Sequence, residues 1–146
     1  VAAARAQAGA MIDRAVIGPR YDDWIEIRPH QLNGPAFGGL VGTARGFGTF
    51  LSDQLRPRST ILGDTARGLF YEPQRAIKGS AIPMTLGWHV GSIAGSWFFY
   101  KEGGGGRFHC VMRLYPERGI GTVVIANATG FDAARFLNVL DPQIMV

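Results

Sequence analysis

The chain has 146 residues, of which 47% are hydrophobic and 18% are charged, a balance typical of one globular domain and unlike that of a disordered segment. Its net charge is +4, but the arginines are spread singly from Arg5 to Arg135, which argues against the gathered basic face of a nucleic-acid-binding protein. No apolar stretch reaches the roughly 18 residues that a membrane-spanning helix requires, so no membrane segment is predicted in these residues.

Residues 1–36 are expected to form a helix and loop that lead into the domain. The chain begins at Val1 within an Ala-rich, helix-like pattern, which is a first indication that the domain is partial. The segment from Gly18 to Gly39 is rich in Pro, Asp, Asn and Gly, the residues that favour turns, and is predicted to be a long surface connection.

Two helices are predicted next. Thr43 is a good N-cap for a helix that ends before Pro57. The apolar residues of this helix fall on one side: Ala44, Phe47, Phe50, Leu51 and Leu55. A shorter helix is predicted from Asp64, also a good N-cap, to about Tyr71, after which residues 72–83 return to loop.

From Met84 onward the sequence predicts four consecutive β-strands. The stretches are short, rich in aromatic and β-branched residues, and separated by turn sequences: MTLGWHV at 84–90, SWFFYK at 96–101, RFHCVMRLY at 107–115 and IGTVVIAN at 120–127. Between the last two, Pro116 presets a turn residue and Gly119 is free to adopt a positive φ angle. Connections of hairpin length imply an antiparallel sheet.

A final amphipathic helix is predicted from Phe131 to Leu140. Asp132 lies in its first turn, where a carboxylate is favourable, and four residues are available to cover one face of the sheet: Ala134, Phe136, Leu137 and Leu140. The prediction is therefore an α+β domain, with an antiparallel sheet of consecutive strands flanked by helices.

The stretch YKEGGGGRFHC, from Tyr100 to Cys110, places Lys101 and Glu102 directly before four glycines. A run without side chains either is a slack loop or lets a ligand approach the backbone closely. On these residues alone, Lys101 and Glu102 are also consistent with a solvated hairpin end that carries an ordinary ion pair.

Four stretches together resemble the serine β-lactamase and penicillin-recognising hydrolases, particularly their class C-like esterase and carboxypeptidase branch. These are FGGLVGTARGFGTFLSDQL at 37–55, LGWHV at 86–90, YKEGGGGRFH at 100–109 and YPERGIGTVVIANATGF at 115–131. The resemblance implies the C-terminal half of a β-lactamase/transpeptidase-like fold, with residues 37–146 as the matched region of a partial domain that spans 1–146.

The resemblance also implies roles for the glycine-rich stretch. Lys101, Glu102 and Gly103 lie where the family has its Lys-Thr-Gly or His-x-Gly triad, and the Gly104 amide is implied to complete an oxyanion hole. Glu102 and Gly105 are then implied to lie against the substrate, a small-molecule ester, amide or peptide. No cofactor is implied.

Two departures from the family pattern affect this expectation. Glu102 replaces a threonine or serine whose hydroxyl helps to hold a substrate carboxylate, and a carboxylate there repels such a substrate. This favours an esterase-like, amidase-like or peptidase-like substrate that lacks a carboxylate at that point.

The second departure is that neither Ser-x-x-Lys nor Tyr-x-Asn occurs in the 146 residues. In the family both motifs precede the matched region. The chain therefore resembles the C-terminal portion of a larger hydrolase, or a shortened relative that has lost its chemistry. Its expected partner is the missing N-terminal part of the same domain, or a second copy of the chain.

The histidines and the cysteine have plainer explanations. His30, His89, His109 and Cys110 are not spaced like a metal site, and no metal is predicted. His109 is expected to be a packed or edge histidine and Cys110 a small buried hydrophobe. The alternative to an enzyme part is a non-catalytic α+β binding or scaffold module that holds a peptide along the glycine-rich strand edge.

Overall fold

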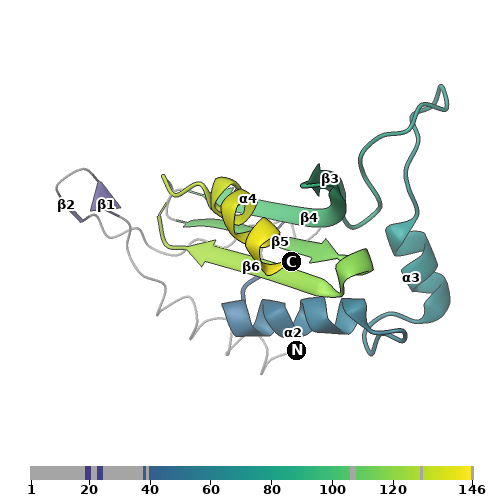
Figure 1. Cartoon of the computed structure of the whole chain (residues 1–146), viewed down its shortest axis with the longest axis horizontal. Coiled ribbons are helices and arrows are strands. Elements are labelled where there is room, and N and C mark those ends of the chain that lie inside the picture. Colours follow the sequence, from purple (N-terminus) through teal and green to yellow (C-terminus); the bar gives the residue numbers. More distant parts are fainter. Residues whose placement is uncertain are drawn as a thin grey trace.

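The computed structural model describes residues 19–20, 23–24, 38, 40–105, 108–128 and 130–145. Its elements follow in the order β1 Pro19–Arg20, β2 Asp23–Trp24, α2 Ala44–Leu55, α3 Asp64–Tyr71, β3 His89–Ile93, β4 Ser96–Gly105, β5 Phe108–Tyr115, the 3₁₀ turn Pro116–Arg118, β6 Ile120–Ala126 and α4 Ala133–Ile144. Helices flank an antiparallel sheet (Figure 1), which confirms the predicted α+β class.

The main sheet has the strand order β3-β4-β5-β6, so every neighbouring pair is a hairpin. Ala94 and Gly95 both have positive φ, 49° and 76°, as a two-residue hairpin turn between β3 and β4 requires. Gly119 has a φ of 64° at the turn into β6 and takes the conformation predicted for it.

The two faces of the sheet carry different helices. On one face, Leu51 of α2 packs with Phe99 and Leu114 around the buried Trp88. On the other, Leu137 of α4 packs on Val111. Because Val111 and Leu114 are three positions apart on β5, their side chains point to opposite faces, and the sheet lies between the two helices.

Helix α2 has the predicted N-cap. The Thr43 hydroxyl accepts a hydrogen bond of 3.0 Å from the Gly46 amide, and the helix ends at Leu55, before Pro57. Helix α3 covers the predicted span, but its N-cap is Gly63, so Asp64 is its first helical residue and not its cap.

The first strand of the main sheet begins later than predicted. The Thr85 hydroxyl accepts hydrogen bonds from the amides of Gly87 (3.3 Å) and Trp88 (3.0 Å), and this closes a turn where a strand was expected. Met84 makes an isolated bridge to His89, and the regular strand starts there. The strand therefore starts five residues later than predicted, because the Thr85 hydroxyl binds backbone amides that a strand would have used.

Helix α4 runs from Ala133 to Ile144, two residues later at its start and four later at its end than predicted. Asp132 caps it through a 2.8 Å bond from the Arg135 amide. Phe136 does not cover the sheet as expected. Its side chain is 46% exposed and lies against Phe131, while Ala133, which the prediction omitted, is fully buried.

The expected lead-in falls largely outside the described residues. Within it the structure has a two-residue hairpin that pairs Pro19 with Trp24, where only a loop was predicted. None of the helices in the described ranges has the length and apolar character needed to cross a bilayer.

Candidate active site at the edge of strand β4

The described glycines of the run, Gly103 to Gly105, are strand and not slack loop, because β4 continues through Gly105. Pairing with β5 extends from Phe99 to Gly105, whereas pairing with β3 stops at Tyr100, opposite His89. Strand β4 is therefore longer than its neighbour β3 (Figure 1). From Lys101 to Gly104, no described strand pairs with β4 on the β3 side. This segment is a strand edge, where an extended ligand can form main-chain hydrogen bonds.

Lys101 and Gly103 share one face of this edge. Lys101 pairs with Met112, which packs in the cluster around Leu51, so its side chain leaves the sheet on the α2 face. The side chain is exposed, and among the described residues its ammonium group has no ion-pair partner. Lys101 therefore provides a positive charge at the unpaired edge.

The two glycines that follow have different surroundings. A Cβ atom at Gly103 would lie 3.1 Å from Cys110 Sγ, a tight contact, while one at Gly104 would lie 3.6 Å from His109 Cδ2, an ordinary contact. Packing therefore favours glycine at 103, and the absence of a side chain there keeps the surface beside Lys101 clear.

Glu102 lies on the opposite face from Lys101. It pairs with Val111, a residue of the cluster under α4, so the two consecutive charged side chains leave the sheet in opposite directions. The expected ordinary ion pair between them is replaced by another. Glu102 Oε1 lies 2.7 Å from His109 Nε2.

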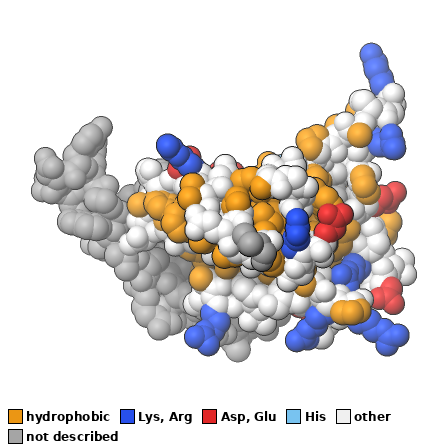
Figure 2. Space-filling model, viewed as in Figure 1, with side chains coloured by type: hydrophobic (Ala, Val, Ile, Leu, Met, Phe, Trp, Pro, Cys, Tyr) orange, Lys and Arg blue, Asp and Glu red, His pale blue; other side chains and the backbone are white. Residues whose placement is uncertain are grey.

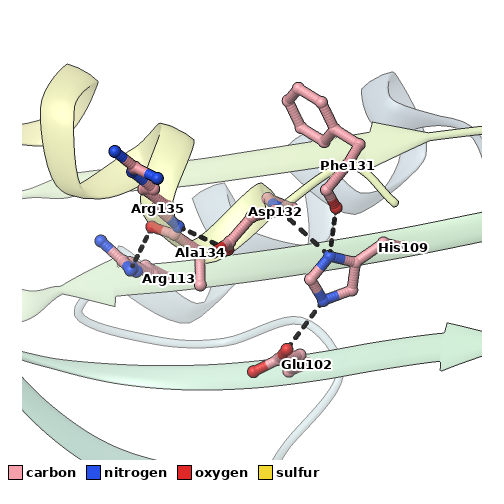
Figure 3. A network of polar contacts seen from close by, with 8 residues as sticks. Glu102, His109, Arg113, Phe131, Asp132, Ala134 and Arg135 are labelled. Atoms are coloured by element: carbon pink, nitrogen blue, oxygen red, sulfur yellow. Dashed lines mark hydrogen bonds and ion pairs between the residues drawn. The ribbon is translucent and has the colours of Figure 1, made fainter. Parts of the chain in front are cut away.

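His109 links three elements (Figure 3). Beyond its contact with Glu102 on β4, its Nδ1 lies 2.6 Å from the Phe131 carbonyl oxygen and 3.2 Å from the Ala133 amide, where α4 begins. The hydrogen bond to Glu102, followed by that to the Phe131 carbonyl, raises the pKa of His109 above 6.5. Its side chain is 17% exposed, consistent with the packed or edge position expected for it.

The pair between Glu102 and His109 was missed in the sequence. His109 is opposite Gly104, two residues along β5 from the partner of Glu102, so the two side chains are diagonal neighbours across a hairpin. The only hint in the sequence is that Glu102 and His109 are seven positions apart on either side of the glycines. This spacing predicts a contact only when the register of the hairpin is known.

The other two histidines and the cysteine add no group to the candidate site. His89 stacks on Tyr100 with ring centroids 5.1 Å apart, and His30 lies outside the described residues. Cys110 is half-buried and not fully buried as expected, and the burial it has raises the pKa of its thiol. No group of three or more potential metal ligands occurs in the part of the chain that the structure describes.

Two hollows lie beside helix α2, but neither is lined by the edge segment 101–104. The first lies next to Asp53, whose carboxylate is already occupied by hydrogen bonds from Ser59 and Thr60. The candidate site is therefore an open strand edge and not an enclosed pocket.

Comparison with models of known protein families finds a match over most of the chain. A family model described as Beta-lactamase matches residues 2–142, nearly the whole sequence. No curated protein and no solved structure matches the chain.

Proposed function

The chain belongs to the beta-lactamase family and, from that premise, we propose that it contributes the Lys101-x-Gly103 strand and the Gly104 amide to a serine-hydrolase acyl-transfer site. The substrate is a small-molecule ester, amide or peptide. The observation that carries the proposal is the unpaired edge of β4 beside the exposed Lys101.

The chemistry of these residues suits acyl transfer. An ammonium group at the edge stabilises negative charge that develops as a carbonyl is attacked and assists deprotonation of a nearby nucleophile. A backbone amide aimed at the developing oxyanion contributes about 10²- to 10³-fold in rate. Glycine at 103 leaves room for the substrate to lie against the strand.

The nucleophile must come from outside these 146 residues. The five serines are Ser52, Ser59, Ser80, Ser92 and Ser96, and none has a lysine three positions later. We propose that a Ser-x-x-Lys segment from the preceding part of the same protein, or from another chain, is placed against the Lys101 face of β4.

The test compares two lysines. In the longest polypeptide that the reading frame encodes around this chain, Lys101→Ala is expected to lower kcat/KM for a nitrophenyl ester by about 10² or more, because it removes charge stabilisation in the transition state. Lys78→Ala is the matched control, since Lys78 is the other lysine of the chain and lies exposed on a loop. The isolated chain is expected to hydrolyse no ester above background.

Equal activity of the two lysine variants would contradict the proposal. A second pair of results would also contradict it: the reading frame contains no Ser-x-x-Lys, and adding a segment that bears this motif produces no hydrolysis. In that case the alternative is favoured, in which the same edge binds an extended peptide by strand addition without cleaving it. Peptide binding that Lys101→Ala leaves unchanged would support the alternative.

A further inference from the structure

The proposed site depends on a segment with almost no side chains to hold it. Gly103 and Gly104 pair with β5 on one side and lie at an unpaired edge on the other. Glycine has more conformational freedom to lose than any other residue, so keeping its amides in one direction requires restraint from neighbours. The nearest side chain that supplies such a restraint is that of Glu102.

Glu102 is held from the far side of the sheet. Its Oε1 lies 2.7 Å from His109 Nε2, and Gly104 is the direct strand partner of His109. His109 thus acts on the glycines from two directions. Its imidazole holds Glu102, the residue before Gly103, and its backbone lies directly opposite Gly104.

His109 is in turn fixed to the start of α4 (Figure 3). When the imidazole is protonated, Nε2–H donates to Glu102 and Nδ1–H donates to the Phe131 carbonyl, 2.6 Å away. When it is neutral with the proton on Nε2, Nδ1 can accept from the Ala133 amide at 3.2 Å, and the Phe131 carbonyl loses this donor. The two protonation states therefore connect β4 to α4 differently.

The charged groups around the imidazole favour its protonated form. Glu102 faces it from β4, and Asp132, the N-cap of α4, acts on it from the helix, with its own oxygen bonded to the Arg135 amide at 2.8 Å. Strand β6 contributes Ala126, an uncharged neighbour. The pKa of His109 is raised, first by the hydrogen bond to Glu102.

We propose that Glu102 and His109 are positioning residues, which hold the Gly103–Gly104 edge of β4 against the start of α4 while His109 is protonated. The effect of these residues on catalysis rests on the proposed function. Their restraint of the glycine edge does not. Glu102 is thereby assigned a role on the α4 face, in place of the contact with substrate that the sequence suggested.

The sign of the pH dependence follows from the raised pKa. A histidine whose pKa is higher in the folded state stabilises that state fully below its ordinary value of 6.5, and this contribution is lost as the pH rises through the folded pKa. The charge-assisted part of the restraint on the glycine edge is therefore fully present below pH 6.5 and is lost as the pH rises through the folded-state pKa of His109, above which a neutral imidazole keeps only the weaker Nε2–H bond to Glu102.

The first experiment needs no enzymatic activity. Nuclear magnetic resonance on this chain measures the titration of His109 and the exchange rates of the Gly103 and Gly104 amides. Glu102→Ala is expected to lower the pKa of His109 and to speed exchange at one or both glycines by about tenfold, because a charge-assisted hydrogen bond is lost. Glu117→Ala, an exposed carboxylate in the turn before β6, is the control and should change neither.

Glu102→Gln separates positioning from charge. The amide oxygen still accepts from Nε2–H, so slow glycine exchange is expected to return while the pKa of His109 stays lower than in the unmodified chain. If Glu102→Ala does not fold, Glu102→Gln and His109→Gln give the same comparison. Glycine protection factors, which are the exchange rates relative to those of an unstructured chain at the same pH, that are equal in all variants and independent of pH between 5 and 9 would overturn the inference.

The second experiment measures catalysis in the longer polypeptide. Glu102→Ala is expected to lower kcat about tenfold with little change in KM, and Glu102→Gln is expected to move the alkaline loss of activity to lower pH. If ester hydrolysis occurs and depends on Lys101, but Glu102 variants retain both kcat and the pH profile, the inference fails while the proposed function stands. If no hydrolysis occurs but the glycine amides respond to Glu102, the proposed function fails and the positioning role stands.

Discussion

Asp53 illustrates how a single residue organises the chain that follows a helix. Its carboxylate, near the end of α2, accepts hydrogen bonds from the Ser59 hydroxyl (2.5 Å) and from the Thr60 hydroxyl (2.6 Å) and amide (2.7 Å). These bonds, that of Ser59 first, lower the pKa of Asp53 from 3.8 to about 2. The ionised carboxylate therefore holds the segment after Pro57 against the helix.

This pKa predicts acid sensitivity. Because the folded-state pKa lies below the ordinary value, the contribution of Asp53 to the free energy of unfolding is present above about pH 4 and is lost as the pH falls toward 2. Asp53→Asn is expected to be less stable at pH 6 and to show a shallower loss of stability between pH 4 and 2. Urea unfolding across this range measures both, with the exposed Asp64→Asn as control. Parallel curves for the original chain and Asp53→Asn would exclude this role.

At the scale of elements, α4 is fastened to β5 by a buried ion pair. Asp141, fully buried, lies with its Oδ2 3.0 Å from Arg113 Nη1 and accepts a 2.6 Å bond from the Tyr115 hydroxyl. Arg113 also donates to Asn138 Oδ1 at 2.7 Å, and its guanidinium lies 4.6 Å from the centre of the Phe98 ring. The network joins two turns of the helix to the strand that carries His109.

Removing one partner of this pair is expected to be costly. Asp141→Ala leaves the Arg113 charge buried without its carboxylate, which costs about 3–5 kcal/mol in the free energy of unfolding. Gln143→Ala, an exposed position on the same helix, should change it by less than about 0.5 kcal/mol. Guanidinium unfolding at pH 7 makes the comparison, and a loss below about 1 kcal/mol for Asp141→Ala would show that water or relaxation replaces the carboxylate.

The elements differ in how far the sequence predicted them. The hairpin between β5 and β6 was predictable because Pro116 and Gly119 restrict the backbone locally. The start of β3 was not, because the Thr85 hydroxyl forms a turn within a stretch whose composition favours a strand. The burial of Ala133 and the exposure of Phe136 depend on how α4 rotates against the sheet, which periodicity alone does not determine.

The sequence proposes residues for the candidate site but does not predict their arrangement. The assignment of Lys101, Gly103 and Gly104 rests on the family resemblance and stays a prediction, while strand alternation explains why Lys101 and Glu102 have opposite directions. The contact between Glu102 and His109 depends on the register of the hairpin between β4 and β5, in which Gly104 pairs with His109. A one-residue change in that register would turn His109 to the other face.

At the scale of the whole molecule, apolar side chains remain exposed beyond the covered sheet. Figure 2 shows hydrophobic side chains gathered across the middle of one face, in the region where Figure 1 places α4. Four exposed hydrophobic residues lie on or just before that helix: Phe131, Phe136, Val139 and Ile144, with exposures of 37%, 46%, 63% and 45%. Exposed apolar side chains that gather on one face of a molecule favour association.

The chain is therefore expected to self-associate, because burying the outer face of α4 removes apolar surface from water at about 25 cal/mol per Å². Light scattering should give an average mass that rises above 15.8 kDa with concentration. Val139→Glu should reduce that rise and the binding of an apolar dye. Ile77→Glu, which removes a side chain that is even more exposed (107% against 63% for Val139) from the loop between α3 and β3, should not. A monomer at all concentrations, or an equal effect of both substitutions, would show that α4 does not direct association, and the exposed residues would then be scattered surface side chains of the ordinary kind.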